Sequence, residues 1–457
     1  MSQAGDRYAE AAPRLATPPP DDLAPETAAL HDALDAQAAA TGSPWLHPSE
    51  PTVQLDLLCG DRVAAWQEAK AAALLAGESC WSELPPLYAR YGTDAGAALI
   101  KRVRELEQAR AAVICDCGMQ ATALVLDALL APGAHVVIGR QTYNKSRTYA
   151  RWLTERLGGG VSLFDDGDLD GLDAAIRDET RVVFVETFTN PRMRAQDIPA
   201  LVERVGAARA RAPGIRLVVD STIATPWGFR TPLLAQGVDV VVASGTKALG
   251  GSDRDLWGYV ATDDIATANA VMDLLAMRGG ILDARRAAVV LDGLGVAESR
   301  HQRRCESAAR VAASLAAHPR VEEVFHPSLS NHPDREVVAR DYLRTGSVLS
   351  FRVSGADEAA TRHVADVIAM TRVFRYALSF DGLVSKVNHH QTVSEYFTPE
   401  PVLRRLGLDR LIRLGIGLEA TDDLTRALDW ALAEAPGISP GDVADWVAHR
   451  EGAWLRR

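Results

Sequence analysis

Cysteine is scarce in this sequence, and basic residues are outnumbered by acidic ones. Five cysteines in 457 residues are a sparse and odd-numbered set, which favours reduced thiols over a disulfide framework. Cys115 and Cys117 lack the C-x-x-C spacing and the second Cys/His pair of a zinc site, so no metal site is predicted. The formal net charge of -11 argues against nucleic acid or an anionic membrane as a partner, because both bind surfaces with excess Lys and Arg.

Long apolar runs are also missing. No stretch approaches the roughly 20 apolar residues that a membrane span needs, and residues 1–15 contain no apolar core of the signal-peptide type. We therefore expect a cytoplasmic protein without membrane contact. Hydrophobic residues at 47% and charged residues at 24% are ordinary for a globular protein, and the length suits two or three domains.

Three regions differ in texture. The first part of residues 1–85 is rich in Ala, Pro and Asp, and this composition predicts that residues 1–85 form an N-terminal extension and arm. Residues 86–295 contain short Val- and Ile-rich runs separated by helical stretches, which is typical of a mostly parallel sheet with crossover helices. Residues 296–457 are largely helical with one strand-like run, VLSFRV, and predict a smaller C-terminal α+β domain. The expected fold class is α/β.

Polar residues stand at the ends of two neighbouring runs. LVVDST places Asp220 at the end of one predicted strand, and VVVASGTK places Ser244, Thr246 and Lys247 at the end of the next. Ligands of open parallel sheets collect beyond the carboxyl ends of the strands, so these residues are candidates for a site. A buried ion pair between Asp220 and Lys247 would be an alternative without function.

The Ser-Gly-Thr-Lys step at 244–247 favours a phosphate-bearing aldehyde. Small and polar residues followed by Gly250 and Gly251 let the backbone approach an anion closely. A desolvated lysine has a lowered pKa and can form an imine, as pyridoxal 5'-phosphate (PLP) requires. PLP also needs a carboxylate at its pyridine nitrogen, and Asp220 fits this need.

Two further positions fit a phosphate and a flat ring. Gly118 and Met119 follow a predicted strand and open a helix, where free backbone amides bind anions, although any strand-to-helix turn can use glycine. Tyr143 follows another strand end and could stack on a cofactor ring, although a lone tyrosine more often serves packing.

Taken together, the motifs resemble those of the Cys/Met-metabolism PLP enzymes, which include cystathionine gamma-synthase, cystathionine gamma-lyase, cystathionine beta-lyase and methionine gamma-lyase. Their order and spacing match over about residues 86–435. The resemblance implies fold-type I, the architecture of aspartate aminotransferase. The motifs are GM at 118–119, PGAHVV leading to Tyr143, ETFTNP at 186–191, VVDSTIATP at 218–226 and SGTKALGG at 244–251.

The resemblance implies roles around the cofactor. Lys247 would hold PLP as a Schiff base and move the substrate α proton, while Asp220 would pair with the pyridine nitrogen. Tyr143 would stack on the ring and take part in proton transfer, and Asn190 would contact the ring near its phenolic oxygen. The phosphate would be bound by Ser244, Thr246 and the backbone amides of Gly118 and Met119.

It also implies substrate contacts and an oligomer. In RLIRLGIGLE, Arg413 would bind the substrate α-carboxylate, for which a planar guanidinium is suited. Ser379 is predicted to lie in the pocket. Tyr88 and Arg90 match a pair that reaches the phosphate from the neighbouring subunit, so a homodimer or homotetramer with shared sites is expected. His389 and His390 are interpreted as structural or rim residues.

Several positions depart from the family pattern. Asn144, Lys145 and Arg147 follow Tyr143 where small residues are usual, and the loop after Ser379 has Phe380-Asp381 and Val384 where Leu-Gly and often a glutamate are expected. One hypothesis is that Lys145 and Arg147 favour an anionic leaving group or a second carboxylate; the alternative is that both face solvent. YGTDAG follows Arg90, and Ser221 follows Asp220, where the family has other residues.

The expected activity is PLP-dependent gamma-substitution or gamma-elimination on an amino acid with a side-chain leaving group, such as a homoserine ester, cystathionine or a methionine-like compound. Beta-elimination by a C-S lyase is the alternative within the same chemistry. A PLP-binding relative without catalysis is the alternative from a different class, against which the joint presence of Lys247, Asp220, Tyr143 and Arg413 argues.

Overall fold

The computed structural model describes residues 59–77, 87–371 and 373–455. Most of the predicted N-terminal arm, residues 1–85, therefore lies outside the described residues. Within it the structure describes α2 (Gly60–Ala76), a helix whose side chains are mostly exposed and none of which is buried. No helix in the described ranges is both long enough and apolar enough to cross a lipid bilayer.

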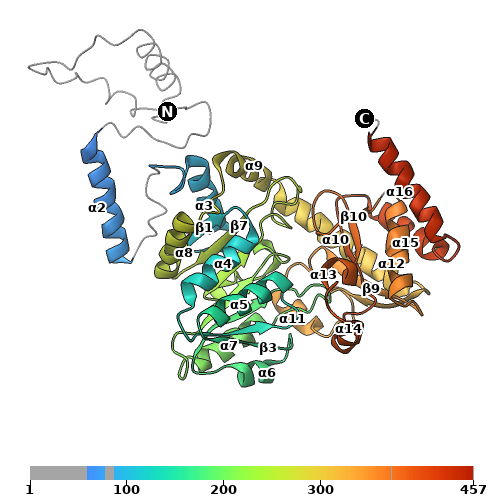
Figure 1. The fold of residues 1–457 in the computed structure, drawn as a ribbon, viewed down its shortest axis with the longest axis horizontal. Helices are drawn as coiled ribbons and strands as arrows, with labels where there is room; N and C mark the ends of the chain where they lie inside the picture. The colour runs from blue at the N-terminus through green and yellow to red at the C-terminus, as the bar shows by residue number, and fades with distance from the viewer. Residues whose placement is uncertain (1–58, 78–86, 372, 456–457) are drawn as a thin grey trace, which may run out of the picture.

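A seven-stranded sheet forms the centre of the larger part of the molecule (Figure 1). Its order is β1-β7-β6-β5-β4-β2-β3; β7 runs antiparallel to both of its neighbours, and the pairs from β6 to β3 are all parallel. The predicted α/β fold with a mostly parallel sheet is confirmed. The strands are β1 (Ala111–Cys115), β2 (His135–Gly139), β3 (Gly160–Phe164), β4 (Thr180–Glu186), β5 (Arg216–Asp220), β6 (Val240–Ala243) and β7 (Gly258–Thr262).

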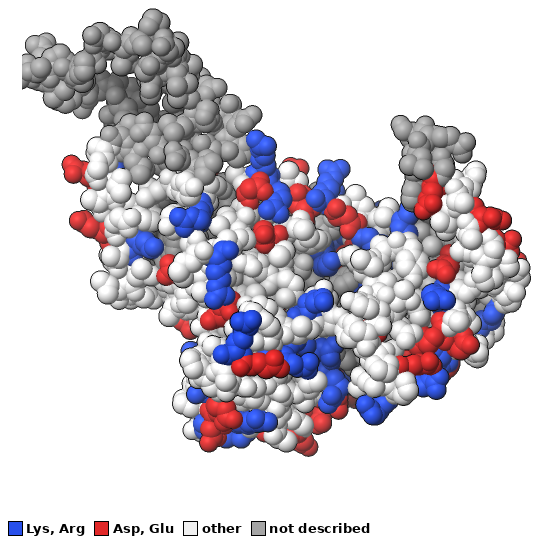
Figure 2. Space-filling model, in the orientation of Figure 1, with Lys and Arg blue, Asp and Glu red and all other residues white. Residues whose placement is uncertain are grey.

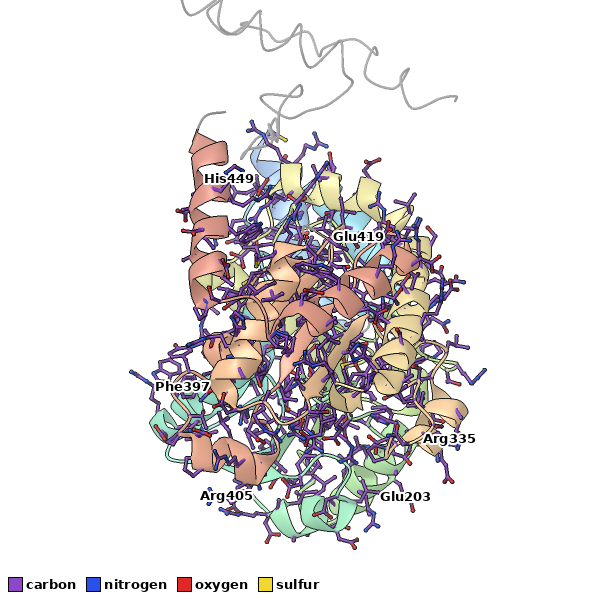
Figure 3. All side chains as sticks on the ribbon, turned by 90° about the vertical axis from the view of Figure 1, so that its right-hand side faces the viewer. Glu203, Arg335, Phe397, Arg405, Glu419 and His449 are labelled. Atoms are coloured by element: carbon purple, nitrogen blue, oxygen red, sulfur yellow. The ribbon has the colours of Figure 1, made fainter. Side chains whose placement is uncertain are left out.

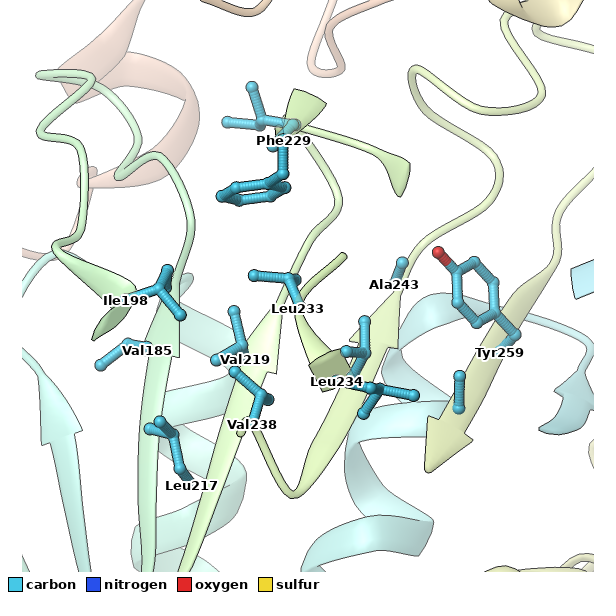
Figure 4. Close-up of a cluster of buried hydrophobic side chains, with 14 of the residues drawn as sticks. Val185, Ile198, Leu217, Val219, Phe229, Leu233, Leu234, Val238, Ala243 and Tyr259 are labelled. Carbon is cyan, nitrogen blue, oxygen red and sulfur yellow. The ribbon is translucent and has the colours of Figure 1, made fainter. Parts of the chain in front are cut away.

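Helices cover both faces of this sheet, and successive strand residues serve opposite cores. In β5, Leu217 and Val219 belong to the cluster drawn in Figure 4, whereas Val218 belongs to the cluster on the other face. This alternation explains why the runs are apolar throughout rather than at every second position. The helices of this part are α3 (Asp94–Glu107), α4 (Gly118–Leu129), α5 (Asn144–Arg156), α6 (Leu169–Ala175), α7 (Ile198–Ala208), α8 (Ile265–Arg278) and α9 (Ala284–Leu294).

A second sheet of five strands, in the order β10-β11-β12-β9-β8, has a core of its own. Its elements follow α9 along the chain and lie on the right in Figure 1. The proposed domain boundary at 295/296 falls between α9 and α10. The elements are α10 (Ala297–Ala317), β8 (Val321–Phe325), α11 (Arg335–Asp341), β9 (Val348–Val353), α12 (Glu358–Met370), β10 (Arg375–Tyr376), β11 (Lys386–His389), α13 (His390–Ser394), α14 (Glu400–Leu406), β12 (Ile412–Gly415), α15 (Thr421–Glu434) and α16 (Pro440–Leu455).

Charged side chains of both signs are interspersed over the face of the molecule that Figure 2 shows. Figure 3, turned by 90°, shows the C-terminal helices toward the viewer, with His449 on α16 and Phe397 between α13 and α14.

Candidate active site

A cavity of about 500 Å³ lies at the carboxyl ends of β4, β5 and β6, and segments of the C-terminal part close it. The position agrees with the rule that ligands of open parallel sheets bind beyond the strand ends. Ten of the twelve predicted site residues line this cavity: Gly118, Met119, Tyr143, Asn190, Asp220, Ser244, Thr246, Lys247, Ser379 and Arg413.

Two buried carboxyl groups lie side by side at its base. Asp220 ends β5 and is the register partner of Glu186, which ends β4. Burial raises the pKa of Asp220 to about 6, although Thr222 donates two hydrogen bonds to its Oδ1, from N at 2.9 Å and from Oγ1 at 2.5 Å. Burial and the neighbouring Asp220 raise the pKa of Glu186 well above its ordinary value. A cation placed here would therefore be stabilised.

Glu186 also orients Tyr143. The Tyr143 N–H donates to Glu186 Oε1 at 2.7 Å, which holds the start of α5 against the end of β4. The Tyr143 side chain is 49% exposed, and burial of its other half together with Glu186 raises the pKa of its hydroxyl. Glu186 opens the ETFTNP motif but was not singled out from the sequence, although the strand-end rule that found Asp220 also applies to it.

Gly118 and Ser244 meet at a second edge of the cavity. A Cβ on Gly118 would lie 2.5 Å from Ser244 Cβ, so only glycine allows the N-terminus of α4 to come this close to the turn after β6. The Ser244 N–H donates to Thr222 Oγ1 at 2.9 Å, which joins this turn to the end of β5. The free amides at the start of α4 thus lie beside the Ser244 hydroxyl, which is suitable geometry for an anion.

The Thr246 hydroxyl forms hydrogen bonds to the backbone of Trp257. Its Oγ1 accepts a hydrogen bond from the Trp257 N–H at 3.0 Å and is 3.2 Å from the Trp257 carbonyl oxygen, to which it donates. The hydroxyl therefore ties the turn after β6 to the segment that leads into β7. Its predicted contact with a phosphate stays a prediction.

Lys247 points into the cavity and is largely shielded from water. Burial lowers the pKa of its amine, and the nearby Lys386 and Arg413 act in the same direction. Among the described residues, its Nζ donates a hydrogen bond to Ser379 Oγ. The ion pair with Asp220 that would have explained Lys247 without function is thus not what the structure contains.

Arg413, on β12, reaches the cavity from the C-terminal part and is 3% exposed. Its Nη1 donates to Asn190 Oδ1 at 3.3 Å and its Nη2 to the Leu378 carbonyl at 2.8 Å. Burial lowers the pKa of its guanidinium to about 10. The Arg413 Cζ and the Lys247 Nζ lie 5.5 Å and 5.3 Å from the ring centroid of Phe380. An amine and a guanidinium thus face one cavity around a single ring.

Tyr88 and Arg90 do not line the cavity of their own chain. The Arg90 guanidinium lies 4.6 Å from the Tyr91 ring centroid, and its Nη1 donates to the Ala276 carbonyl at 2.9 Å. Their position is compatible with service to another subunit, which stays a prediction.

One wall of the cavity is formed by the start of α5, whose residues depart from the family pattern, together with α13 and Glu395, which no motif indicates. Asn144 Nδ2 donates to the Ser394 carbonyl at 3.0 Å, and Arg147 Nη2 lies 3.8 Å from Glu395 Oε1. Lys145 is exposed but lines the cavity, whereas Arg147 is turned inward and half-buried. Arg147 therefore does not fit the alternative in which it simply faces solvent.

The two neighbouring histidines differ. His389 is structural as predicted, because its ring bonds to Glu358 Oε2 and Thr392 Oγ1, both at 2.8 Å. His390 does not lie at a rim: this side chain is 2% exposed, lines the cavity, and has no hydrogen bond to its ring within the described part of the chain. No group of three or more His, Cys, Asp or Glu in the described ranges could hold a metal ion.

Comparison with known proteins gives the same result as the geometry. Residues 78–433 match the model of the Cys/Met metabolism PLP-dependent enzyme family. The chain belongs to this family. It is therefore a PLP-dependent enzyme of the trans-sulfuration type with the fold-type I architecture, and the predicted cofactor and fold are confirmed.

Individual relatives are about 30% identical to the chain. It is 34% identical over 350 residues to cystathionine gamma-synthase of Mycobacterium tuberculosis, which covers 76% of the chain and 86% of the relative. L-methionine gamma-lyase of Fusobacterium nucleatum is 30% identical over 349 residues, or 76% of the chain and 86% of the relative. Cystathionine gamma-synthase 1 of Arabidopsis thaliana, a chloroplastic protein, is 31% identical over 74% of the chain, which spans only 58% of that longer relative.

A solved structure agrees with the fold. Cystathionine gamma synthase from Xanthomonas oryzae pv. oryzae in complex with cystathionine superposes with a TM-score of 0.71 at 29% identity, over 77% of this chain and 88% of that one.

The residues of the cavity fit PLP. The Asp220 carboxyl, with its pKa raised by burial, would be stabilised by a protonated pyridine nitrogen, and the close approach of Gly118 to Ser244 brings helix amides and a hydroxyl together where a phosphate could bind. The shielded amine of Lys247 lines the same cavity and donates to Ser379 of the C-terminal part.

Proposed function

We propose that this protein catalyses gamma-substitution or gamma-elimination on an amino acid whose side chain carries a leaving group. The observation that carries the proposal is the placement of Lys247 and Arg413 around Phe380 in one cavity. An α-amino acid has an amine and a carboxylate two bonds apart, so it needs an amine-exchanging group and a carboxylate-binding group within a few ångströms of each other. Relatives named for gamma-synthase and gamma-lyase activity support the gamma position.

The cofactor is held by this chain at three points in the proposal. Lys247 carries it, Asp220 pairs with the pyridine nitrogen, and the amides of Gly118 and Met119 bind the phosphate together with the hydroxyls of Ser244 and Thr246. Tyr143 stacks on the ring, and Asn190 contacts it near the phenolic oxygen. Bound PLP withdraws electrons from the substrate Cα, which makes the α proton acidic.

The chain's own groups bind and move protons. Arg413 binds the substrate α-carboxylate, and Ser379 is a second substrate-binding residue of the same cavity. The Nζ of Lys247, with its pKa lowered by burial, takes the proton from Cα and can return it, because an amine with a lowered pKa is neutral for more of the time. Gamma chemistry needs a second proton transfer at Cβ, and the proposal gives the Tyr143 hydroxyl a part in it because Tyr143 lines the same cavity.

The charged side chains on the wall formed by α5 and α13 affect which leaving group the cavity favours. Arg147 and Lys145 bring positive charge to the cavity, with Glu395 opposite Arg147. This favours a leaving group with its own carboxylate, such as a succinyl ester of homoserine, over an uncharged one.

One alternative is an outcome of the test: beta-elimination of a cysteine-like thioether would use the same groups on a shorter substrate. The alternative of a PLP-binding relative without catalysis is set aside, because the family is one of enzymes and Lys247, Asp220, Tyr143 and Arg413 line a single cavity. We also propose that the active unit is a homodimer or homotetramer in which Tyr88 and Arg90 complete the neighbouring subunit's site.

The experiment is product analysis with the PLP-loaded protein and five candidates: cystathionine, methionine, O-succinylhomoserine, O-acetylhomoserine and cysteine. Release of 2-oxobutyrate, or formation of a thioether when cysteine accompanies a homoserine ester, is expected and would establish gamma chemistry. Pyruvate from cystathionine or cysteine would indicate beta-elimination. Lys247→Ala should form none of these products, and Lys101→Ala, which changes an exposed lysine on α3, should act as the parent does. Absence of every product from the parent would contradict the proposal.

A further inference from the structure

His390 is a buried polar side chain without a partner at the wall of the active-site cavity. It is 2% exposed, and neither Nδ1 nor Nε2 has a hydrogen-bond partner in the part of the chain that the structure describes. The ring lines the cavity together with Arg413. Buried imidazole nitrogens normally find partners inside the protein, and leaving both unpaired is costly unless a ligand pairs with them.

The strand register places His390 diagonally across from Arg413. Arg413 on β12 pairs with Asn388 on β11, and the ladder ends at the next pair, His389 with Ile412. One residue further, at the start of α13, the His390 N–H donates to the Leu411 carbonyl at 2.9 Å. His390 follows Asn388 by two residues where β11 passes into α13, diagonal neighbours across a strand pair lie within reach of long side chains, and both His390 and Arg413 line the cavity. The imidazole and the guanidinium therefore face the same space.

The backbone around His390 is held in place from outside the sheet. The Ser394 carbonyl at the end of α13 accepts a hydrogen bond from Asn144 Nδ2 at 3.0 Å, and Glu395 lies 3.8 Å from Arg147. These contacts join α13 to α5 on the far side of the cavity. The imidazole is thus attached to a segment fixed at both ends.

The chemistry of this pair of side chains fits a carboxylate. Burial and the charge of Arg413 lower the pKa of His390, so the free ring is neutral and has one N–H to donate. Two of the five N–H groups of Arg413 already serve Asn190 and the Leu378 carbonyl. A carboxylate can accept about four hydrogen bonds, whereas Arg413 has three N–H groups left to donate. At least one acceptor position on the carboxylate therefore stays open for an imidazole N–H.

We propose that His390 donates a hydrogen bond to the same substrate carboxylate that Arg413 binds, and so is a further substrate-binding residue of this protein. The inference rests on the proposed function, because it takes an amino acid as the ligand. It applies to the binding of the α-carboxylate and not to the leaving group.

The test compares two probes that differ only in the carboxylate. L-norleucine has an α-carboxylate and no leaving group, and n-pentylamine has the same carbon chain without the carboxylate. Their dissociation constants on the PLP-loaded protein are measured by calorimetry. The parent should prefer norleucine. His390→Leu, which removes both ring nitrogens, should reduce that preference about tenfold or more, while His390→Gln, which restores an N–H donor, should stay within about threefold of the parent.

His449→Leu is the matched control, because His449 is exposed on α16 and does not line the cavity (Figure 3). If His390→Leu does not retain PLP, His390→Met replaces it as the apolar variant. The inference is overturned if the apolar variant keeps the parent's preference, if it weakens both probes equally, or if the parent shows no preference. A protein that forms no product from the amino-acid panel but loses its norleucine preference in His390→Leu would sink the proposed reaction and leave the carboxylate contact standing.

Discussion

Glu186 and Asp220 are register partners at the carboxyl ends of β4 and β5, and burial raises the pKa of both carboxyl groups. Two such groups at one end of a sheet are unfavourable when both are ionised, because each is desolvated and each repels the other. They become favourable when a cation lies against Asp220. In the proposal that cation is the protonated pyridine nitrogen of PLP, so the site without PLP would be the less stable of the two.

Asp220→Asn should therefore weaken PLP binding and change the pH dependence of the PLP-free protein. Because the pKa of Asp220 is about 6 in the folded state and 3.8 in the reference state, the folded protein holds more protons between these values, and its stability falls as pH rises through them. The cost above pH 6 is about 3 kcal/mol at most. Urea unfolding of the PLP-free proteins at pH 4.5 and 7.5 should show Asp220→Asn gaining stability relative to the parent at the higher pH.

In the same variant, the affinity for PLP should fall about tenfold or more, since a charge-assisted hydrogen bond is lost. Asp178→Asn, at an exposed position, is the control for a removed carboxylate. Unchanged PLP affinity in Asp220→Asn would show that the pyridine nitrogen does not pair with this residue.

The ion pair between Arg147 and Glu395 should select among leaving groups. Arg147→Gln is expected to lower kcat/KM for O-succinylhomoserine about tenfold relative to O-acetylhomoserine, because only the first ester carries a carboxylate for the guanidinium to bind. Glu395→Gln should shift the ratio the other way, since it removes the competing anion 3.8 Å from Arg147. Initial rates with the two esters give the ratio.

Arg151→Gln is the matched control, one turn further along α5 and exposed. An equal loss for both esters in Arg147→Gln would mean that Arg147 only supports the packing of α5 against α13.

The parts of the site that were predictable from sequence are those in which local pattern determines position. Asp220 and Lys247 each follow a short apolar run, and parallel strands bring such ends to one edge whatever the loops do. Glu186 obeys the same rule and was overlooked. His390 and Glu395 could not be placed this way, because they enter the cavity only through the packing of the C-terminal sheet against α5, some 250 residues away in the chain. The use of the Thr246 hydroxyl by the Trp257 backbone likewise depends on a contact that no motif encodes.

Subunit complementation should reveal whether Arg90 serves a neighbouring site. Arg90 does not line the cavity of its own chain, and in the proposal it binds the phosphate in the partner's site. Arg90→Ala and Lys247→Ala should each be inactive, but a hybrid of the two contains one site with both residues intact. Random pairing at equal amounts in a dimer should restore about a quarter of the parent activity, because half the dimers are hybrids and half their sites are complete.

Co-expression of Lys247→Ala with the double variant Arg90→Ala/Lys247→Ala provides the blank, since no intact site can form. A mixture of the two single variants that stays at the level of this blank would place Arg90 outside the shared site.

The buried carboxyl group of Glu107, which does not line the cavity, should make the free energy of unfolding depend on pH. It ends α3, is 2% exposed, and accepts a hydrogen bond from the Tyr259 hydroxyl. Burial raises the pKa of Glu107 from 4.5 to about 7. The folded state thus binds more protons than the unfolded state between these values. The free energy of unfolding therefore falls as pH rises from about 4.5 to 7, and the full destabilisation is present above pH 7.

Glu107→Gln keeps the acceptor oxygen for Tyr259 and has no charge to desolvate. Its free energy of unfolding in urea should match the parent's at pH 4.5 and exceed it by up to about 3 kcal/mol at pH 8. Glu105→Gln, on the exposed side of the same helix, should show no such pH-dependent gain. A Glu107→Gln variant that is less stable than the parent at pH 8 would mean that the ionised carboxylate, through its bond to Tyr259, stabilises the fold despite its burial.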